Sequence, residues 1–258
     1  MVSPHRRMRW RSSSSTTVLA PLPISDLATF VSTRDAMHRV AEHVLAKACY
    51  LDDGEIRLTA FPGGFSTPLL TGGRRVRVDG ADLVVDTDGR SARIGLTTID
   101  DAAAFLDIEP GFPHELYAPA TECRGSEPLA LDRDAAASLA AWYAFTAEVL
   151  VLFATEIADA SPSQLILWPE HFDQAFYTED ADESRRANYG ASPGDEGHPE
   201  PYIYVGPWAT PAADAFWNAA TFNGAVLPLA QVVDEKDPTE VGLRFLRRGR
   251  KVLAPTLI

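Results

Sequence analysis

The stretch Ala135–Ala154, AAASLAAWYAFTAEVLVLFA, decides how the rest of the chain is arranged. Its only charged residue is Glu148, and a helix of this length would span a bilayer. Three features disfavour a membrane span: Glu148 lies inside the apolar run, Asp132 and Asp134 precede it, and no basic flank follows it. We therefore predict a soluble protein whose central helix, from Asp132 to about residue 158, is buried nearly all round.

The segments on either side of this helix carry strand patterns. Before it, the alternating runs between residues 55 and 96 are separated by Asp79-Gly80 and Asp88-Gly89, which predict an antiparallel meander of about four strands. After it, a second β region is expected, with a long loop over residues 178–201. The strands of this region are expected at residues 165–167, 171–177, 202–205 and 225–229. Shorter helices are expected over residues 34–48, where Thr33 would be the cap, and over residues 98–106, 210–220 and 237–251.

The order of these elements defines the fold class. Helices and strands do not alternate as βαβ units do, so we predict an α+β fold. An antiparallel β meander and a second β region would pack on the long buried central helix and the shorter helices. Residues 18–258 are expected to form a single domain. Residues 1–17 are basic, rich in serine and without the apolar core of a signal peptide, which predicts a disordered tail or a start-site artefact. The Arg6–Arg7 pair leaves export as the alternative.

Composition narrows the choice of partners and compartment. The formal net charge is −13, and so acidic a chain repels phosphate backbones and anionic membrane surfaces. We therefore expect no nucleic acid and no membrane among its partners. Cys49 and Cys123 are too few for a disulfide framework and lie in no paired motif, which is compatible with the cytoplasm, where we expect the protein. The oligomeric state is left open.

The chemically dense segment is Trp168–Trp208, WPEHFDQAFYTEDADESRRANYGASPGDEGHPEPYIYVGPW. His171 and Asp173 would project from one face of a strand, and His198 and Glu200 share the same spacing. If the two pairs met across a long hairpin, these four nitrogen and oxygen donors would suit a divalent metal ion that activates a water molecule. The alternative for this segment is a structured loop, in which Pro193-Gly194-Asp195 is a turn and the acids bond loop amides.

A third interpretation uses the aromatic residues of the same segment. They could line a small-molecule pocket with Asn188 and Arg186 as polar anchors. Across these interpretations, the residues expected in a ligand-binding or polar cluster are Asp173, Asn188, Asp195, Glu200, Tyr202 and Tyr204. Arg185 and Arg186 could fold back onto the acids of the cluster. His38 and His43 lie five residues apart on the first helix, where solvated or capping roles are expected.

The C-terminal half also resembles a known family. The strings HFDQAF, ANYGASPGDEGHPEPYIYVGPW, FWNAATFNGAVLPL and DPTEVGLRFL resemble an uncharacterised bacterial family, a domain of unknown function. The resemblance covers about residues 165–246 and implies a phenylalanine-aspartate strand, a P-G-D turn, a P-E-P motif, a tryptophan helix and a leucine-proline strand. The matching positions are Phe172, Asp173, Pro193, Gly194, Asp195, Pro199, Glu200, Pro201, Tyr204, Trp217, Leu227, Pro228, Asp237 and Pro238. It implies a fold unit but no activity.

Two functions therefore follow from the sequence. The first is a protein with a small-molecule or ion pocket around residues 168–208, whose catalytic residues, if any, are not identified. The second is a non-catalytic interaction module that uses the acidic and aromatic surface of the same segment to bind a protein partner. A convergent cleft would favour the first, and a flat exposed aromatic patch would favour the second. The basic C-terminal helix end, Arg244–Lys251, either complements its own helix dipole or docks against acidic residues 159–200.

Overall fold

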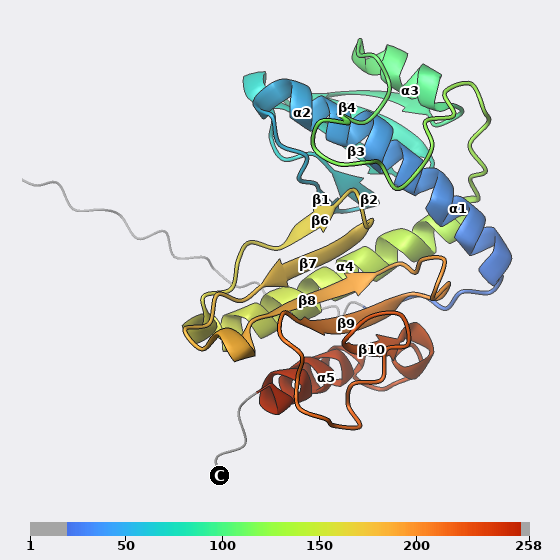
Figure 1. The fold of residues 1–258 in the computed structure, drawn as a ribbon. Coiled ribbons are helices and arrows are strands. Elements are labelled where there is room, and N and C mark those ends of the chain that lie inside the picture. The colour runs from blue at the N-terminus through green and yellow to red at the C-terminus, as the bar shows by residue number, and fades with distance from the viewer. Residues whose placement is uncertain (1–19, 254–258) are drawn as a thin grey trace, which may run out of the picture.

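The computed structural model describes residues 20–253, so the predicted tail lies outside the described residues (Figure 1). Helix α1 (Leu27–Val40) continues through a π-helical turn (Ala41–Ala46) into α2 (Lys47–Asp53). The predicted start of this helix at residue 34 is wrong, because Asp26 is the cap and accepts hydrogen bonds from the amides of Ala28 and Thr29. The Thr33 hydroxyl instead accepts a hydrogen bond from the amide of Asp132, at the start of the central helix.

The first sheet is the predicted meander with one additional strand. It is antiparallel in the order β1-β2-β3-β4-β5. Its strands are β1 (Thr59–Phe61), β2 (Gly64–Ser66), β3 (Arg74–Asp79), β4 (Asp82–Thr87) and β5 (Arg90–Gly95). Gly63 and Gly64, which the sequence pattern predicts to end a strand, form a tight turn into β2, which carries the fully buried Phe65. Helix α3 (Ile99–Leu106) follows, capped by Thr98 as its sequence predicts.

The second sheet follows helix α4 (Arg133–Glu156) and is also antiparallel, in the order β10-β9-β8-β7-β6. Its strands are β6 (Ile166–Trp168), β7 (Asp173–Tyr177), β8 (Ala187–Ser192), β9 (Tyr202–Pro207) and β10 (Ala225–Pro228). Strand β8 lies within the segment predicted to be a long loop, residues 178–201, and that prediction is wrong for these residues. Because β8 pairs with both β7 and β9, those two strands are not hairpin partners. Helix α5 (Pro238–Val252) ends the described chain.

The predicted helix over residues 210–220 is wrong. Side chains in this segment bond the nearby backbone and compete with helical hydrogen bonds. The Asp214 carboxylate accepts from the amide of Phe216, and the Trp217 indole donates to the carbonyl of Ala212. Asn218 makes two hydrogen bonds with the backbone of Val226 in β10. The segment is therefore an irregular loop that packs beside the second sheet.

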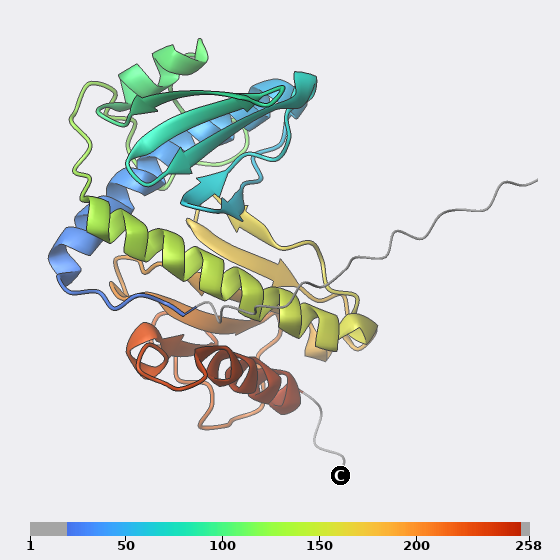
Figure 2. The ribbon, with the colours of Figure 1, turned by 180° about the vertical axis from the view of Figure 1, so that it is seen from behind.

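Helix α4 has one face in the core and one at the surface. Asp132 caps it, and its buried residues include Trp142, Tyr143, Phe145 and Phe153. Figure 2 shows α4 from the side opposite to that of Figure 1. On the exposed face of the helix, Val151 and Leu152 are 53% and 41% exposed. The expectation of burial nearly all round is therefore wrong for this face. Within residues 20–253, α4 is the helix long and apolar enough to cross a membrane, and half of its most apolar window is buried inside the protein.

The two sheets share one continuous hydrophobic core and meet at their edges (Figure 1). Leu58, just before β1, exchanges two backbone hydrogen bonds with Leu167 of β6, at 3.0 and 2.9 Å. Phe65 of β2 packs edge-on against both Tyr143 of α4 and Phe172, which precedes β7. These contacts confirm the predicted α+β class, with two antiparallel sheets packed around a long central helix.

Candidate functional site

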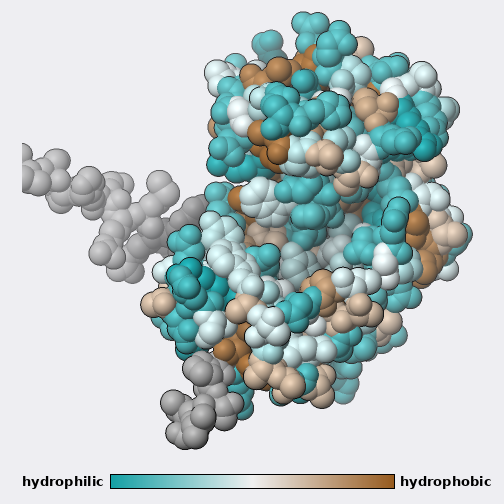
Figure 3. All heavy atoms as spheres, in the orientation of Figure 1, coloured by the Kyte–Doolittle hydropathy of each residue, from teal (hydrophilic) through white to brown (hydrophobic). Residues whose placement is uncertain are grey.

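A cleft of about 1050 Å³ lies between α1, the loop at residues 120–124 and strands β7–β9. Figure 3 shows it as the hollow in the middle of this face, below the first sheet and α1. The residues that line it on the α1 side are Arg34, Asp35, His38, Arg39, Ala120, Thr121, Glu122 and Arg124. Those on the sheet side are Glu170, His171, Phe172, Asp173, Asn188, Ser192, Gly194, Asp195, Glu196, Gly197, Tyr202, Tyr204, Gly206 and Phe222.

Asp173 and Tyr204 form a hydrogen-bonded pair on the sheet side of the cleft. Asp173 begins β7 and Tyr204 lies in β9, so β8 separates them. Gly190 of β8 lies opposite Tyr204, and a Cβ atom at Gly190 would come within 2.5 Å of the Tyr204 ring. The missing side chain therefore leaves room for the tyrosine ring to cross the sheet, and its hydroxyl donates to Oδ2 of Asp173.

The carboxyl group of Asp173 is buried and only half satisfied. The residue is 6% exposed, and its Oδ1 has no hydrogen-bond partner in the protein. No Lys, Arg or His nitrogen among residues 20–253 lies within ion-pair distance of it. Burial raises the pKa of Asp173 from 3.8 to about 6, although the hydrogen bond from Tyr204 and the nearby His171 act in the opposite direction.

Asp195 and Tyr202 form a second pair, but this one organises a loop. The Asp195 carboxylate accepts hydrogen bonds from the amides of Gly197 and His198 and from the Tyr202 hydroxyl, at 2.7 to 2.8 Å. Gly194 adopts a φ of 99° and lies so close to Arg34 and the carbonyl of Pro199 that a side chain would clash. The predicted P-G-D turn is therefore present, and its acid bonds loop amides as the structured-loop interpretation expects.

The α1 wall is fixed to the second sheet by two side chains. Arg34, which is buried, pairs with Asp35 at 2.7 Å and donates to the carbonyl of Pro199. The His38 ring stacks on the Phe172 ring, with 5.1 Å between the ring centroids, and its Nε2 lies 2.8 Å from the carbonyl oxygen of Pro169. Burial lowers the pKa of His38 to about 4, so the ring is neutral at physiological pH. The expected solvated or capping role of His38 is wrong.

The loop at residues 120–124 is fixed to the π-helical turn of the first helix. Glu42 is fully buried, and its carboxylate accepts hydrogen bonds from the amides of Ala120 and Thr121 and from the Thr121 hydroxyl. His43, also buried, lies 3.0 Å from the carbonyl and hydroxyl of Thr121, so its expected solvated or capping role is wrong as well. These bonds position Glu122 and Arg124 at the cleft.

The structure does not assemble the four predicted metal ligands. Phe172 has a φ of 52°, so His171 lies in a turn before β7 rather than on one strand face with Asp173. The His198 ring packs against Tyr202 and, like Glu200, is not among the cleft-lining residues. Across the described part of the chain, no group of three or more His, Cys, Asp and Glu side chains could hold a metal ion. The prediction of a divalent site at His171, Asp173, His198 and Glu200 is therefore wrong.

The predicted polar cluster agrees with the structure better than the predicted metal site does. Asp173, Asn188, Asp195, Tyr202 and Tyr204 all line the cleft, whereas Glu200 is exposed outside it. The side chain of Asn188 accepts a hydrogen bond from the Trp208 indole at 2.9 Å. The α1 wall of the cleft was not among the residues predicted from the sequence. No local signal could have found it, because Arg34 and its partner carbonyl at Pro199 are 165 residues apart.

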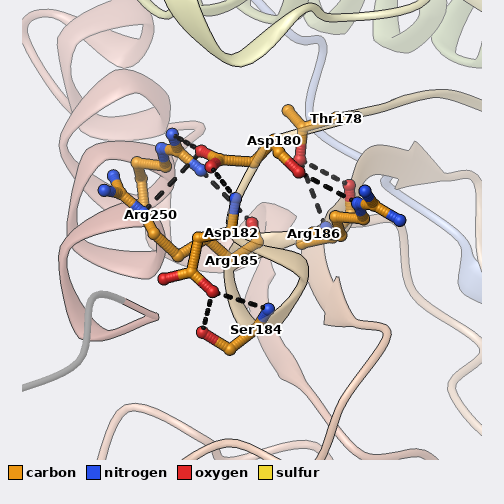
Figure 4. A network of polar contacts seen from close by, with 8 residues as sticks. Thr178, Asp180, Asp182, Ser184, Arg185, Arg186 and Arg250 are labelled. Atoms are coloured by element: carbon orange, nitrogen blue, oxygen red, sulfur yellow. Dashed lines mark hydrogen bonds and ion pairs between the residues drawn. The ribbon is translucent and has the colours of Figure 1, made fainter.

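Arg185 and Arg186 do not fold back onto Asp173. Figure 4 shows them in a separate network at the end of α5, where Arg250 pairs with Asp180 and donates to the carbonyl of Arg185. Arg186 donates to the carbonyl of Asp180 at 3.0 Å, and Asp182 accepts from Ser184. The basic end of α5 thus docks on the acidic 159–200 segment of the same chain, which was one of the two alternatives from the sequence.

No protein-family model, curated protein or solved structure matches this chain in comparisons with all three. The resemblance of residues 165–246 to an uncharacterised family stays a prediction. Its tryptophan helix is absent, because Trp217 lies in an irregular loop. The cleft is therefore interpreted from its own residues.

Proposed function

We propose that the protein binds a small organic molecule in the cleft between α1 and strands β7–β9. The observation that carries this proposal is the unsatisfied carboxyl oxygen of Asp173, buried in the wall of a cleft of about 1050 Å³. A buried polar atom without a partner costs free energy, and a ligand atom that bonds it would remove that cost. The size of the cleft suits a small molecule, and its lining combines four aromatic residues with a larger number of polar and charged ones.

The shape of the surface favours this function over the interaction module. Four acids and three aromatic residues of the 168–208 segment line the cleft rather than a flat patch. Trp208 is the segment's large exposed apolar side chain, at 53% exposure, and it packs on Tyr177. One such ring is too small a surface for a protein interface, so a protein partner is the less supported alternative.

The proposal is tested by filling the cleft. Gly206 lines it, and a Cβ atom there would meet nothing closer than 4.0 Å, so Gly206→Trp places a large side chain in the cleft without a clash at its base. A library of small metabolites is screened by thermal shift against the wild-type protein and this variant. We expect at least one compound to raise the melting temperature of the wild type and to have no effect on Gly206→Trp.

The matched control is Ala137→Trp, which adds the same side chain at an exposed position of α4 outside the cleft. It should retain every response of the wild type. Compounds that stabilise both tryptophan variants equally would show that binding occurs elsewhere and would overturn the proposal.

A further inference from the structure

We propose that the ligand carries a protonated amino group that docks on the free oxygen of Asp173, which makes the cleft a site for organic amines. This inference rests on the proposed function and names the class of ligand. It follows from three observations: the contacts of Asp173, the distribution of charge in the cleft, and the aromatic rings beside the carboxylate.

The Asp173 carboxylate has one oxygen that is held in place and another that can still accept a hydrogen bond. The Tyr204 hydroxyl holds Oδ2, which fixes the plane of the carboxylate, while Oδ1 lacks a donor. A carboxylate oxygen accepts hydrogen bonds from N–H donors, and an ammonium group combines that donor with the opposite charge. The ligand would thereby replace the ion-pair partner that Asp173 lacks among residues 20–253.

The charges in the cleft are divided between its walls. Its three arginines, Arg34, Arg39 and Arg124, lie on the α1 side, and carboxylates at 3.7 Å or less pair with each of them. On the sheet side the acids are Glu170, Asp173, Asp195 and Glu196, and none of these four has an ion-pair partner in the described chain. A cationic group is therefore attracted to the sheet wall, and an anionic one is repelled by it.

Aromatic rings complete the site for a cation. The Tyr204 ring packs edge-to-face against the Phe222 ring, with 6.1 Å between the ring centroids, and its centroid lies 6.2 Å from that of the Tyr202 ring. All three residues line the cleft. The faces of such rings attract ammonium groups, most strongly where water is excluded. Rings beside a buried carboxylate thus recognise both the charge and the carbon atoms of an organic amine.

Two kinds of titratable group lie near Asp173: charged side chains in the preceding turn, and tyrosines of β9 and α4. They are His171 and Glu170 in the preceding turn, Tyr202 and Tyr204 of β9, and Tyr143 of α4. Burial raises the pKa of each of the three tyrosines, so these remain neutral hydroxyls at physiological pH. Amine binding should therefore strengthen as the pH rises from 5 to 7.5 and Asp173 loses its proton.

The experiment compares probes with the same or a similar carbon skeleton whose end groups differ in charge. Calorimetry at pH 7.5 measures the binding of 1,5-diaminopentane and 2-phenylethylamine, their alcohol counterparts 1,5-pentanediol and 2-phenylethanol, and the acids glutarate and 3-phenylpropionate. We expect at least one amine to bind and its alcohol and acid counterparts to bind at least tenfold more weakly. Asp173→Asn keeps the acceptor for Tyr204 but removes the charge, and it should weaken amine binding by about tenfold to a hundredfold.

The matched control is Glu179→Gln, which removes an exposed acid of the same segment outside the cleft and should change amine affinity by less than about threefold. Equal affinity of Asp173→Asn and the wild type for the amine, or failure of both amines to bind at millimolar concentration, would overturn the inference. If an alcohol or acid binds as tightly as its amine counterpart or more tightly, and Gly206→Trp abolishes that binding, the amine class is wrong while the proposed function stands. If the metabolite library also gives no response that depends on the cleft, both are wrong.

Discussion

At the scale of single residues, the folded protein would be more stable if the side chain of Asp173 carried no charge. Its burial favours the protonated form, and no arginine or lysine of the described chain offsets the cost of ionisation. Groups whose pKa is shifted in this way cluster at functional sites, where stability is given up for chemistry. Because the charge of Asp173 is costly in the folded state, removing it should change the free energy of unfolding that is measured.

We predict that the Asp173→Asn variant gains stability relative to the wild type as the pH rises. Because the pKa of Asp173 is raised from 3.8 to about 6 on folding, its stabilising contribution is present below pH 3.8 and is lost as the pH rises through 6. The difference in unfolding free energy should shift by about 2 kcal/mol in favour of Asp173→Asn between pH 4 and 7. Urea denaturation at both pH values measures it. Asp234→Asn, at an exposed position, is the control, and an equal shift in that variant would contradict the prediction.

At the scale of elements, the cleft depends on a loop that has no regular structure of its own. The amides of residues 120 and 121 are bound by the buried carboxylate of Glu42, which comes from the π-helical turn of the first helix. Such turns occur frequently at functional sites. Here the turn lies where Glu42 and His43 both reach Thr121, so one short segment of helix positions the loop at the cleft.

We expect Glu42→Ala to release this loop. Two amides and one hydroxyl would lose their acceptor, which should destabilise the protein by about 3 kcal/mol or more. Arg124 is exposed and lies within the loop, so trypsin should cleave after it faster in this variant than in the wild type. Mass spectrometry of a digestion time course detects the cut. The control is Glu109→Ala, an exposed acid earlier in the same connection, and equal acceleration there would show that the Glu42 bonds do not hold the loop.

A second element-level contact fixes α5 to the turn between β7 and β8. Arg250 and Asp180 are 10% and 13% exposed, and Arg250→Ala would leave a largely buried carboxylate with only the weaker pairing to Arg185 at 3.8 Å. We expect a loss of about 2 to 4 kcal/mol in the free energy of unfolding. Lys251→Ala removes an exposed charge from the next position and should cost less than about 0.5 kcal/mol. Chemical denaturation measures both, and similar losses in the two variants would contradict the prediction.

At the scale of the whole molecule, the shared core makes the two sheets dependent on each other. Phe65 of the first sheet, Tyr143 of α4 and Phe172 beside the second sheet form one aromatic cluster, and the Tyr143 hydroxyl donates to the carbonyl of Phe172 at 2.6 Å. His38 of the cleft stacks on the same Phe172. The cleft wall is therefore supported directly by the residues that join the two sheets.

We predict that Phe65→Ala destabilises both sheets equally, by about 3 to 5 kcal/mol. Native-state hydrogen exchange of amides in β4 and β9 reports the two sheets separately. Leu69→Ala, at a position that is 64% exposed, should change neither by more than about 0.5 kcal/mol. Loss of protection in β4 alone would show that the sheets unfold as separate domains, and it would also contradict the predicted single domain.

Features that depend on neighbouring residues could be predicted from the sequence. The Asp132 cap, the long apolar run and the Asp-Gly turns established α4 and most of the first meander, because caps and tight turns are set within a few residues. The density of polar and aromatic residues at 168–208 likewise pointed to Asp173, Asn188, Asp195, Tyr202 and Tyr204, all of which line the cleft. Local patterns were misleading at Thr210-Pro211, where side-chain bonds to the backbone replace the expected helix.

The sequence by itself therefore determined the class of fold, the central helix and most of the sheet wall of the site. Only the tertiary structure decided that β8 separates β7 from β9, which splits the predicted metal ligands. It also brought Arg34 and His38 of α1 to face strands that follow more than a hundred residues later, through contacts with Pro199 and Pro169 that are 165 and 131 residues apart in sequence. Strand order and the burial of Asp173 arise from packing between distant segments, and no pattern within a short window of sequence specifies that packing.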